Sequence, residues 1–320
     1  MFNKHSILEN YYRDIIPVLP DIVSCAIEKL SEDEISDIEE IRLRANKPVM
    51  IYLKNEDYFL GKNGCLEKIP TEGIYINTMD LNKSLQVMCD FSLYSIEEEL
   101  KQCFLTIKGG HRVGIVGRAV IEKENIKTIK DISGLNIRIA KEVIGCGTKL
   151  VKELYSDGVK HTLIASPPNC GKTTLLRDIV RNLSTGILES GIYGYKVGVV
   201  DERSEIAGCY LGIPQRDVGL RTDVLDACPK AQGIMLMLRS MSPEIIAVDE
   251  IGSNDDADAI LNAIYSGVKV IATVHGKDIN EILKKPGVKC LIENNAFERI
   301  VFLSRKKGPG TIEEIINVWG

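Results

Sequence analysis

The sequence lacks an uninterrupted apolar run that approaches the ~18 residues a membrane-spanning helix needs. It also lacks a secretory signal, because Phe2 to His5 lead into an amphipathic pattern and not into an apolar core. Aromatic residues make up only 6% of the chain, and the net charge is −5. Without a basic, aromatic-rich stripe, we do not expect a nucleic-acid partner. We therefore expect a cytoplasmic chain, and any association with a membrane must go through a partner or a surface contact.

Disulfide and zinc patterns are absent as well. The nine cysteines are odd in number, and no two of them have the Cys-x-x-Cys spacing. This predicts a reduced chain with no disulfide framework and no zinc. The length of 320 residues predicts two domains.

The first half of the chain, residues 1–144, predicts a small α+β domain with an antiparallel sheet. Residues 6–30 carry apolar positions at helical spacing, broken around Pro17 and Pro20. Alternating patterns then predict strands at 41–44, 49–53, 58–60, 112–121 and 137–140, with helices at 78–90 and 95–104.

The second half, residues 145–320, follows a candidate linker, Gly145-Cys146-Gly147. Strands are predicted at 161–166, 195–201, 244–249 and 268–274, and helices at 148–156, 172–184, 228–241 and 254–265. This alternation predicts an α/β fold with a mostly parallel sheet covered on both faces. Residues 299–304 and 312–318 predict an antiparallel extension, with its turn at Gly308-Pro309-Gly310.

A phosphate-binding loop is predicted where a short apolar strand leads into a helical pattern. The loop reads Ser166-Pro167-Pro168-Asn169-Cys170-Gly171-Lys172-Thr173-Thr174. Backbone N–H groups at such a helix start cradle phosphates, and the helix dipole favours anions there. Lys172 is expected to reach the outer phosphates of ATP, and Thr173 to place its hydroxyl on Mg²⁺.

The loop departs from the usual pattern because Ser166 stands where a glycine normally opens it. Asn169 is one of the few residue types that tolerate positive φ, so the loop can still close. An ordinary turn between a strand and a helix is the alternative interpretation, and the acidic residues downstream argue against it.

Two carboxylates end the apolar run 245–248 and are the second candidate site feature. Asp249 is expected to hold Mg²⁺, and Glu250 to orient or deprotonate the attacking water. The alternative is a core strand followed by solvated acids. Asp201 and Glu202 end another apolar run, and Glu202 is a further candidate for polarising water. A mixed-charge surface loop is the alternative there.

Polar residues at other strand ends complete the predicted site. His275 follows the apolar run 270–274, and a neutral histidine there can report on phosphate. Arg221 lies in a basic turn, 219–223, and Arg239 precedes the carboxylate strand. An arginine supplied by a neighbouring subunit stabilises transition-state charge. First-domain arginines are further candidates for that role, namely Arg42, Arg44, Arg112, Arg118 and Arg138.

These motifs resemble those of the secretion ATPase superfamily, which includes the motor ATPases of type II and type IV secretion and of type IV pili, and within it a sporulation stage III family. The resemblance covers nearly the whole chain and includes segments 38–44, 108–118, 221–226, 239–244 and 249–252. By this resemblance the family's acidic box falls on Asp201-Glu202, its carboxylate strand on Asp249-Glu250, and its histidine box on His275.

The resemblance implies a RecA-like P-loop NTPase domain preceded by a PAS-like domain. It implies a homo-oligomeric ring, expected to be a hexamer, that binds ATP and Mg²⁺ between the domains. It also implies a motor on the mother-cell side that docks on a membrane protein of a sporulation channel or secretion complex. Two alternatives stay open: a nucleic-acid-handling P-loop ATPase, and a structural ring that binds ATP with little turnover.

Overall fold

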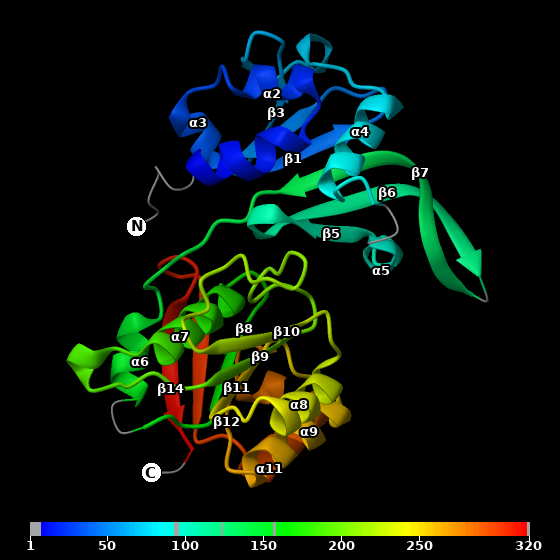
Figure 1. The fold of residues 1–320 in the computed structure, drawn as a ribbon. Coiled ribbons are helices and arrows are strands. Elements are labelled where there is room, and N and C mark those ends of the chain that lie inside the picture. Colours follow the sequence, from blue (N-terminus) through cyan, green and yellow to red (C-terminus); the bar gives the residue numbers. More distant parts are fainter. Residues whose placement is uncertain (1–7, 93–95, 123, 156–157, 319–320) are drawn as a thin grey trace. The chain divides into compact units, whose positions relative to one another are not determined.

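The computed structural model describes residues 8–92, 96–122, 124–155 and 158–318. The chain divides into two compact units, Met1–Lys141 and Glu142–Gly320, which are described separately (Figure 1). In the described ranges, no helix is both long and apolar enough to cross a bilayer.

An antiparallel sheet of seven described strands organises the first unit, in the order β4-β3-β2-β1-β7-β6-β5. The strands are β1 (Ile38–Arg44), β2 (Met50–Leu53), β3 (Glu56–Leu60), β4 (Leu66–Glu67), β5 (Phe104–Ile107), β6 (His111–Glu122) and β7 (Asn125–Arg138). The helices are α2 (Asp21–Ile27), α3 (Glu32–Asp37), α4 (Thr78–Met88) and α5 (Glu97–Lys101). Ile41 and Leu43 of β1 are buried while Arg44 is exposed, as expected for a sheet with one face on the core.

Two predictions for the first unit are wrong in their bounds. The predicted helix at 95–104 ends at Lys101, and β5 begins at Phe104; residues 93–95 lie outside the described residues. The predicted strand at 137–140 is the end of the long β7, which starts at Asn125. The first part of β7 is largely exposed, so it lacks the apolar alternation by which a half-buried strand is recognised.

The second unit contains a sheet of seven described strands in the order β10-β9-β11-β12-β8-β13-β14. All neighbouring pairs are parallel except β13 and β14. The strands are β8 (Thr162–Ser166), β9 (Val197–Asp201), β10 (Thr222–Asp226), β11 (Ile245–Val248), β12 (Lys269–His275), β13 (Arg299–Ser304) and β14 (Thr311–Asn317). The helices are α6 (Thr148–Tyr155), α7 (Lys172–Thr185), α8 (Lys230–Ser240), α9 (Asn254–Tyr265), α10 (Ile279–Ile282) and α11 (Pro286–Glu293). The predicted parallel sheet with an antiparallel extension is confirmed.

Both faces of this sheet are covered by helices (Figure 1). One apolar cluster joins α6 and α7 to residues such as Ile164 and Val199 on one face. A second cluster joins α8, α9 and α11 to Leu163 and Val200 on the other face. Neighbouring strand residues thus alternate between two buried faces, which is why these strands read as continuous apolar runs.

The register of the parallel strands brings their carboxyl ends to one edge of the sheet. Ser166 at the end of β8 pairs with His275 at the end of β12. Val248, just before Asp249, pairs with Val200, just before Asp201. Ser166, Asp201, Asp249 and His275 therefore lie at the same edge, and ligands of parallel sheets bind in the crevice outside such strand ends.

Two segments differ from their predicted structure. The predicted basic turn at 219–223 is wrong in part, because Thr222 begins the edge strand β10. Residues 145–147, the candidate linker, lie inside the second unit and are hydrogen-bonded to Asp178 of α7. Because β10 is a half-buried edge strand, it shows little of the apolar alternation from which strands are predicted. Residues 145–147 contact Asp178, which lies more than 30 residues away, so the local sequence does not indicate that contact.

Candidate functional site

The loop of residues 167–171 joins β8 to α7, which begins at Lys172. Asn169 has a φ of 57°, so it adopts the left-handed conformation that its residue type tolerates. Gly171 has a φ of 86°, and a Cβ there would lie 3.1 Å from the amide nitrogen of Gly310. The loop therefore closes tightly against the turn between β13 and β14.

A cleft of about 510 Å³ opens over this loop, within the ~300–1,000 Å³ range of ligand pockets. Six of the predicted loop residues line it: Pro168, Asn169, Gly171, Lys172, Thr173 and Thr174. Ser166 and Cys170 are buried, and Pro167 lines a different cleft. The Ser166 carbonyl accepts a hydrogen bond from the Gly276 amide at 3.0 Å. Ser166 therefore acts in the strand and does not obstruct the cleft.

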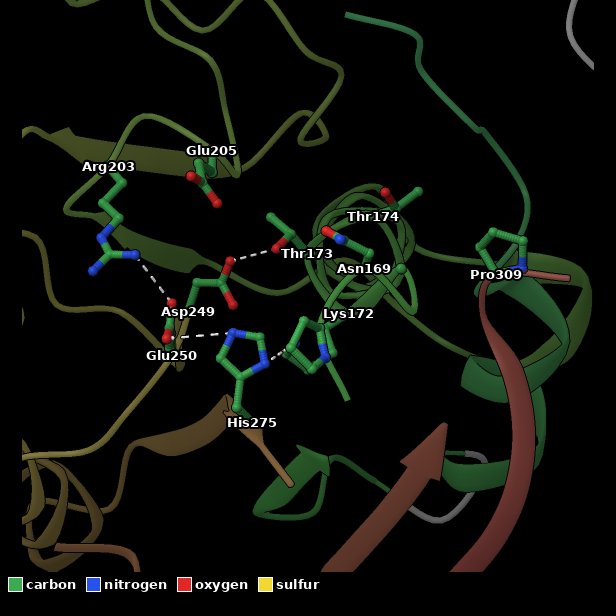
Figure 2. A pocket seen from close by; sticks show the side chains of 12 residues that line it. Asn169, Lys172, Thr173, Thr174, Arg203, Glu205, Asp249, Glu250, His275 and Pro309 are labelled. Carbon is green, nitrogen blue, oxygen red and sulfur yellow. Dashed lines mark hydrogen bonds and ion pairs between the residues drawn. The ribbon is translucent and has the colours of Figure 1, made fainter. Parts of the chain in front are cut away.

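Two oxygen-bearing side chains that suit Mg²⁺ lie side by side in the cleft (Figure 2). The Thr173 hydroxyl donates to Oδ2 of Asp249 at 2.6 Å. The Thr273 hydroxyl of β12 donates to Oδ1 of the same carboxylate. Hydroxyl and carboxylate oxygens are ligands that Mg²⁺ prefers, so this donor set fits the metal. The sequence did not point to Thr273, because it lies inside an apolar run.

Glu250 sits at the rim of the cleft in a strained backbone conformation. Its φ is 54°, and its amide donates to the Thr273 hydroxyl at 2.8 Å. Its Oε1 lies 3.3 Å from Nε2 of His275, and its Oε2 lies 3.2 Å from Nη1 of Arg203. A left-handed glutamate held from two sides is the kind of strain that concentrates at functional sites.

Lys172 points at His275 across the cleft. Its Nζ lies 2.9 Å from Nδ1 of the imidazole (Figure 2). An ammonium can only donate, so Nδ1 accepts and Nε2 carries the proton that faces Glu250. Burial lowers the pKa of Lys172, and the charges of Asp249 and Glu250 oppose that shift. A lysine that is 6% exposed and points at a neutral imidazole is well placed to receive an anion.

Three cleft residues were not predicted as site residues from the sequence: Arg203, Glu205 and Pro309. Pro309 lies in the turn between β13 and β14, which was predicted only as a turn. Arg203 and Glu205 lie on the loop after β9, where Glu202 was predicted to act. Glu202 instead forms an ion pair with Lys230 of α8, and it does not line the cleft. Sequence spacing favoured the acid directly after the strand, but the loop turns so that the later acid, Glu205, lines the cleft.

The remaining predicted residues lie elsewhere. Arg221 donates to the carbonyls of Ser184 and Thr185 at 2.9 and 3.2 Å, at the end of α7 opposite to the phosphate loop. In its own chain it caps this helix and does not line the cleft. Arg239 is exposed in the last turn of α8.

Asp201 is buried and turned toward its own backbone. Its carboxylate accepts hydrogen bonds from the amides of Glu205, Ile206 and Ala207 at 2.8–2.9 Å. Burial raises the pKa of Asp201 to about 6, and the amide hydrogen bonds oppose that rise. The first acid of the predicted acidic box thus holds a loop in place.

The sheet order, the loop after β8 and the acids after β11 define a RecA-like P-loop NTPase fold. Solved structures with a similar fold include the following two. The ATPase DotB of Legionella pneumophila aligns with a TM-score of 0.54 and 15% identity, over 88% of this chain and 75% of that one. The pilus retraction motor PilT, solved with bound ADP, aligns with a TM-score of 0.57 and 15% identity, over 90% and 77%. These likenesses confirm the predicted RecA-like P-loop fold.

The chain belongs to the family described as sporulation stage III, protein AA, which matches residues 14–320. Stage III sporulation protein AA of Bacillus subtilis (strain 168) is 45% identical over 302 residues, covering 94% of each chain. The predicted resemblance to a sporulation family with a secretion ATPase fold is confirmed.

Proposed function

We propose that this protein is a Mg²⁺-dependent ATPase that serves as the motor of a sporulation secretion or channel complex. The observation that carries the proposal is the meeting of Lys172, Thr173, Asp249, Glu250 and His275 in one cleft. They come from three separate segments of the chain, and they would supply a phosphate contact, a metal site and a water-orienting acid.

Binding is proposed to begin at the start of α7, where backbone amides and the helix dipole attract the phosphates. Lys172 then exchanges its contact with His275 for an outer phosphate oxygen. Thr173 and Asp249 would hold Mg²⁺, which neutralises charge that develops on the transferred phosphoryl group. Arg203 and His275 keep the Glu250 carboxylate oriented toward the attacking water.

His275 links nucleotide state to the catalytic acid in this proposal. It contacts Lys172 through Nδ1 and Glu250 through Nε2. When Lys172 turns to a phosphate, Nδ1 loses its donor, and the imidazole is free to tilt. The position of Glu250 therefore depends on whether the outer phosphate is present.

The proposed motor is an assembly of several copies of this chain. We propose a homo-oligomeric ring, a hexamer, in which a neighbouring subunit supplies an arginine that stabilises transition-state charge. Arg221 or a first-unit arginine would have this role in trans, so free subunits should hydrolyse ATP slowly. The first unit is proposed to be PAS-like, and the ring to dock on a membrane protein on the mother-cell side.

Phosphate release by the wild type, Lys172→Ala and Glu250→Gln tests the chemistry. We expect about a hundredfold loss or more in each variant, with nucleotide binding lost only in Lys172→Ala. Lys289→Ala and Glu293→Gln are matched controls, because this exposed ion pair lies on α11 outside the cleft. Equal rates in all five proteins would refute the proposal. Binding without turnover at any protein concentration would indicate a structural ring.

A further inference from the structure

Glu205 reaches the nucleotide cleft from a loop without regular structure. It follows β9 by several residues, yet its side chain lines the cleft together with Thr173 and Asp249 (Figure 2). A carboxylate on an irregular loop keeps a fixed position only if other groups hold the backbone. Two buried charged side chains do so here, Arg177 of α7 and Asp201 of β9.

Arg177 holds the carbonyl side of this loop. Its Nη2 donates to the Glu205 carbonyl at 2.6 Å, and its Nε donates to the Ile206 carbonyl. Asp201 holds the amide side, with its carboxylate accepting from the Glu205 and Ile206 amides at 2.9 Å. The backbone on both sides of the Glu205 side chain is therefore fixed by charge-assisted hydrogen bonds.

The burial of Arg177 is unfavourable on its own. The residue is 9% exposed, and among the described residues it forms no ion pair with a carboxylate. Burial lowers its pKa, and the more distant charges of Glu142, Asp201 and Asp249 oppose that shift. Burying a guanidinium against two loop carbonyls costs free energy, because the ion must be desolvated. This cost makes it an unfavourable way to stabilise a surface loop. This points to a purpose beyond loop stability.

The helix that carries Arg177 supplies that purpose. Arg177 lies five residues after Lys172 on α7, or ~7.5 Å along the helix axis. The element that binds the phosphates thus also grips the backbone of Glu205. Any displacement of α7 moves the acid with it.

We propose that Arg177 is a positioning residue that holds Glu205 in register with the phosphate loop, so that the carboxylate meets the metal or its water when nucleotide is bound. The inference rests on the proposed ATPase function, and it assigns Glu205, not Glu202, as the acid of this loop that acts there. Arg177 acts through Glu205 and touches no phosphate.

A double-mutant cycle separates this role from a purely structural one. Lysine keeps the charge of Arg177 but cannot donate to both carbonyls with a rigid fork. We expect Arg177→Lys to lower kcat about tenfold, while the Kd of a fluorescent ADP analogue changes less than about threefold. In a Glu205→Gln background the same change should lower kcat less than about twofold, because the group it positions is already lost.

Equal fold-losses in both backgrounds would overturn the proposal and leave Arg177 a structural residue. Arg181→Lys is the matched control, since Arg181 lies one turn further along α7 and pairs with Asp178. We expect it to leave kcat within about twofold of the wild type. If Lys172→Ala hydrolyses as the wild type does, the ATPase proposal itself is wrong. If activity depends on Lys172 and the cycle is additive, only the positioning role is wrong.

Hydrogen exchange provides a readout that does not need turnover. The amides of Glu205, Ile206 and Ala207 should exchange about tenfold faster in Arg177→Lys than in the wild type. In Arg181→Lys, the exchange rates of the same three amides should equal those of the wild type. Unchanged exchange in Arg177→Lys would contradict the proposal. Should Arg177→Lys fail to fold by circular dichroism, the cycle is run with Asp201→Asn, which loosens the same loop from its amide side.

Discussion

Asn169 decides whether the phosphate loop closes without a glycine at its position. Its φ of 57° lies in the left-handed region, where a β-branched side chain is strained. We expect Asn169→Gly to bind nucleotide as the wild type does, and Asn169→Val to destabilise the protein by about 1–2 kcal/mol. Urea unfolding and the Kd of a fluorescent ADP analogue measure the two effects.

Asn295 is the control for Asn169. It also has a left-handed backbone, with a φ of 56°, but it lies between α11 and β13 and outside the cleft. Asn295→Val should lower stability by a similar amount and leave the Kd unchanged. If both valine variants change the Kd alike, the strain at Asn169 has no special place in nucleotide binding.

The free energy of unfolding should depend on pH through the titration of His161. Burial lowers its pKa to about 4, with the charge of Lys269 adding to the shift and that of Glu298 opposing it. Its Nδ1 accepts from the Val270 amide at 3.2 Å, a contact that protonation would break. Because the unfolded chain takes up this proton near pH 6.5, the free energy of unfolding should fall as the pH drops from 6.5 toward 4.

The measurement for His161 is a difference between two proteins. Asp201, whose pKa is raised to about 6, contributes the opposite slope between its unfolded value and pH 6, so the wild type alone does not report on His161. His161→Gln removes one titration and keeps Asp201. We expect its stability relative to the wild type to rise by up to about 2 kcal/mol between pH 7 and pH 4, after allowance for partial exposure. Parallel pH profiles would contradict this.

At the scale of elements, α7 also holds the segment 145–147, near the start of the second unit. The Asp178 carboxylate, which is 2% exposed, accepts from the amides of Gly145 at 3.0 Å and Gly147 at 2.6 Å. Arg181 donates to the same carboxylate at 2.8 Å. The helix that starts at Lys172 therefore holds residues 145–147 through Asp178 and the Glu205 loop through Arg177.

Asp178→Ala should free the segment 145–147. Loss of two hydrogen bonds to a buried carboxylate is expected to lower stability by about 2–4 kcal/mol and to speed amide exchange at Gly145 and Gly147. Arg181→Ala is the control, because it keeps the carboxylate and should change exchange at these two amides little. Equal exchange in both variants would indicate that the segment is held by other contacts.

The elements that the sequence predicted best are the buried parallel strands of the second unit. The pattern of β11, four apolar residues followed by Asp249 and Glu250, is local and needs no knowledge of the fold. By contrast, β10 at the sheet edge is only half buried, so its Thr222–Asp226 segment reads as a turn. An edge strand is recognised mainly by its pairing with β9, which is a non-local contact.

The residues of the candidate site also fall into two groups: those that local sequence patterns predict and those that non-local contacts position. Lys172, Thr173 and His275 follow directly from loop and strand-end patterns, and the structure brings them to one cleft. Glu205 could not be predicted, because its position depends on Arg177, which lies 28 residues earlier on another element. Arg221 looked like a catalytic arginine by its neighbours in sequence, while its contacts are the carbonyls at the end of α7.

At the scale of the whole molecule, each unit has its own apolar core. One buried cluster is built from residues between Tyr11 and Ile137, and the two clusters of the second unit contain none of them. The cleft proposed to bind nucleotide is lined by residues of the second unit. Separate cores predict that the two units unfold in separate transitions.

Nucleotide binding should then stabilise the second unit selectively. A ligand present at about 100 times its Kd stabilises the folded state by ~2.7 kcal/mol, which corresponds to roughly 5–10 °C in Tm for a domain of this size. Calorimetry with and without Mg²⁺ and a non-hydrolysable ATP analogue should show one transition moving and the other fixed. Lys172→Ala should abolish the shift, whereas Lys289→Ala should keep it. Equal shifts of both transitions would mean that the nucleotide also couples the first unit to the folded state, because a ligand stabilises only the structure whose unfolding abolishes its site.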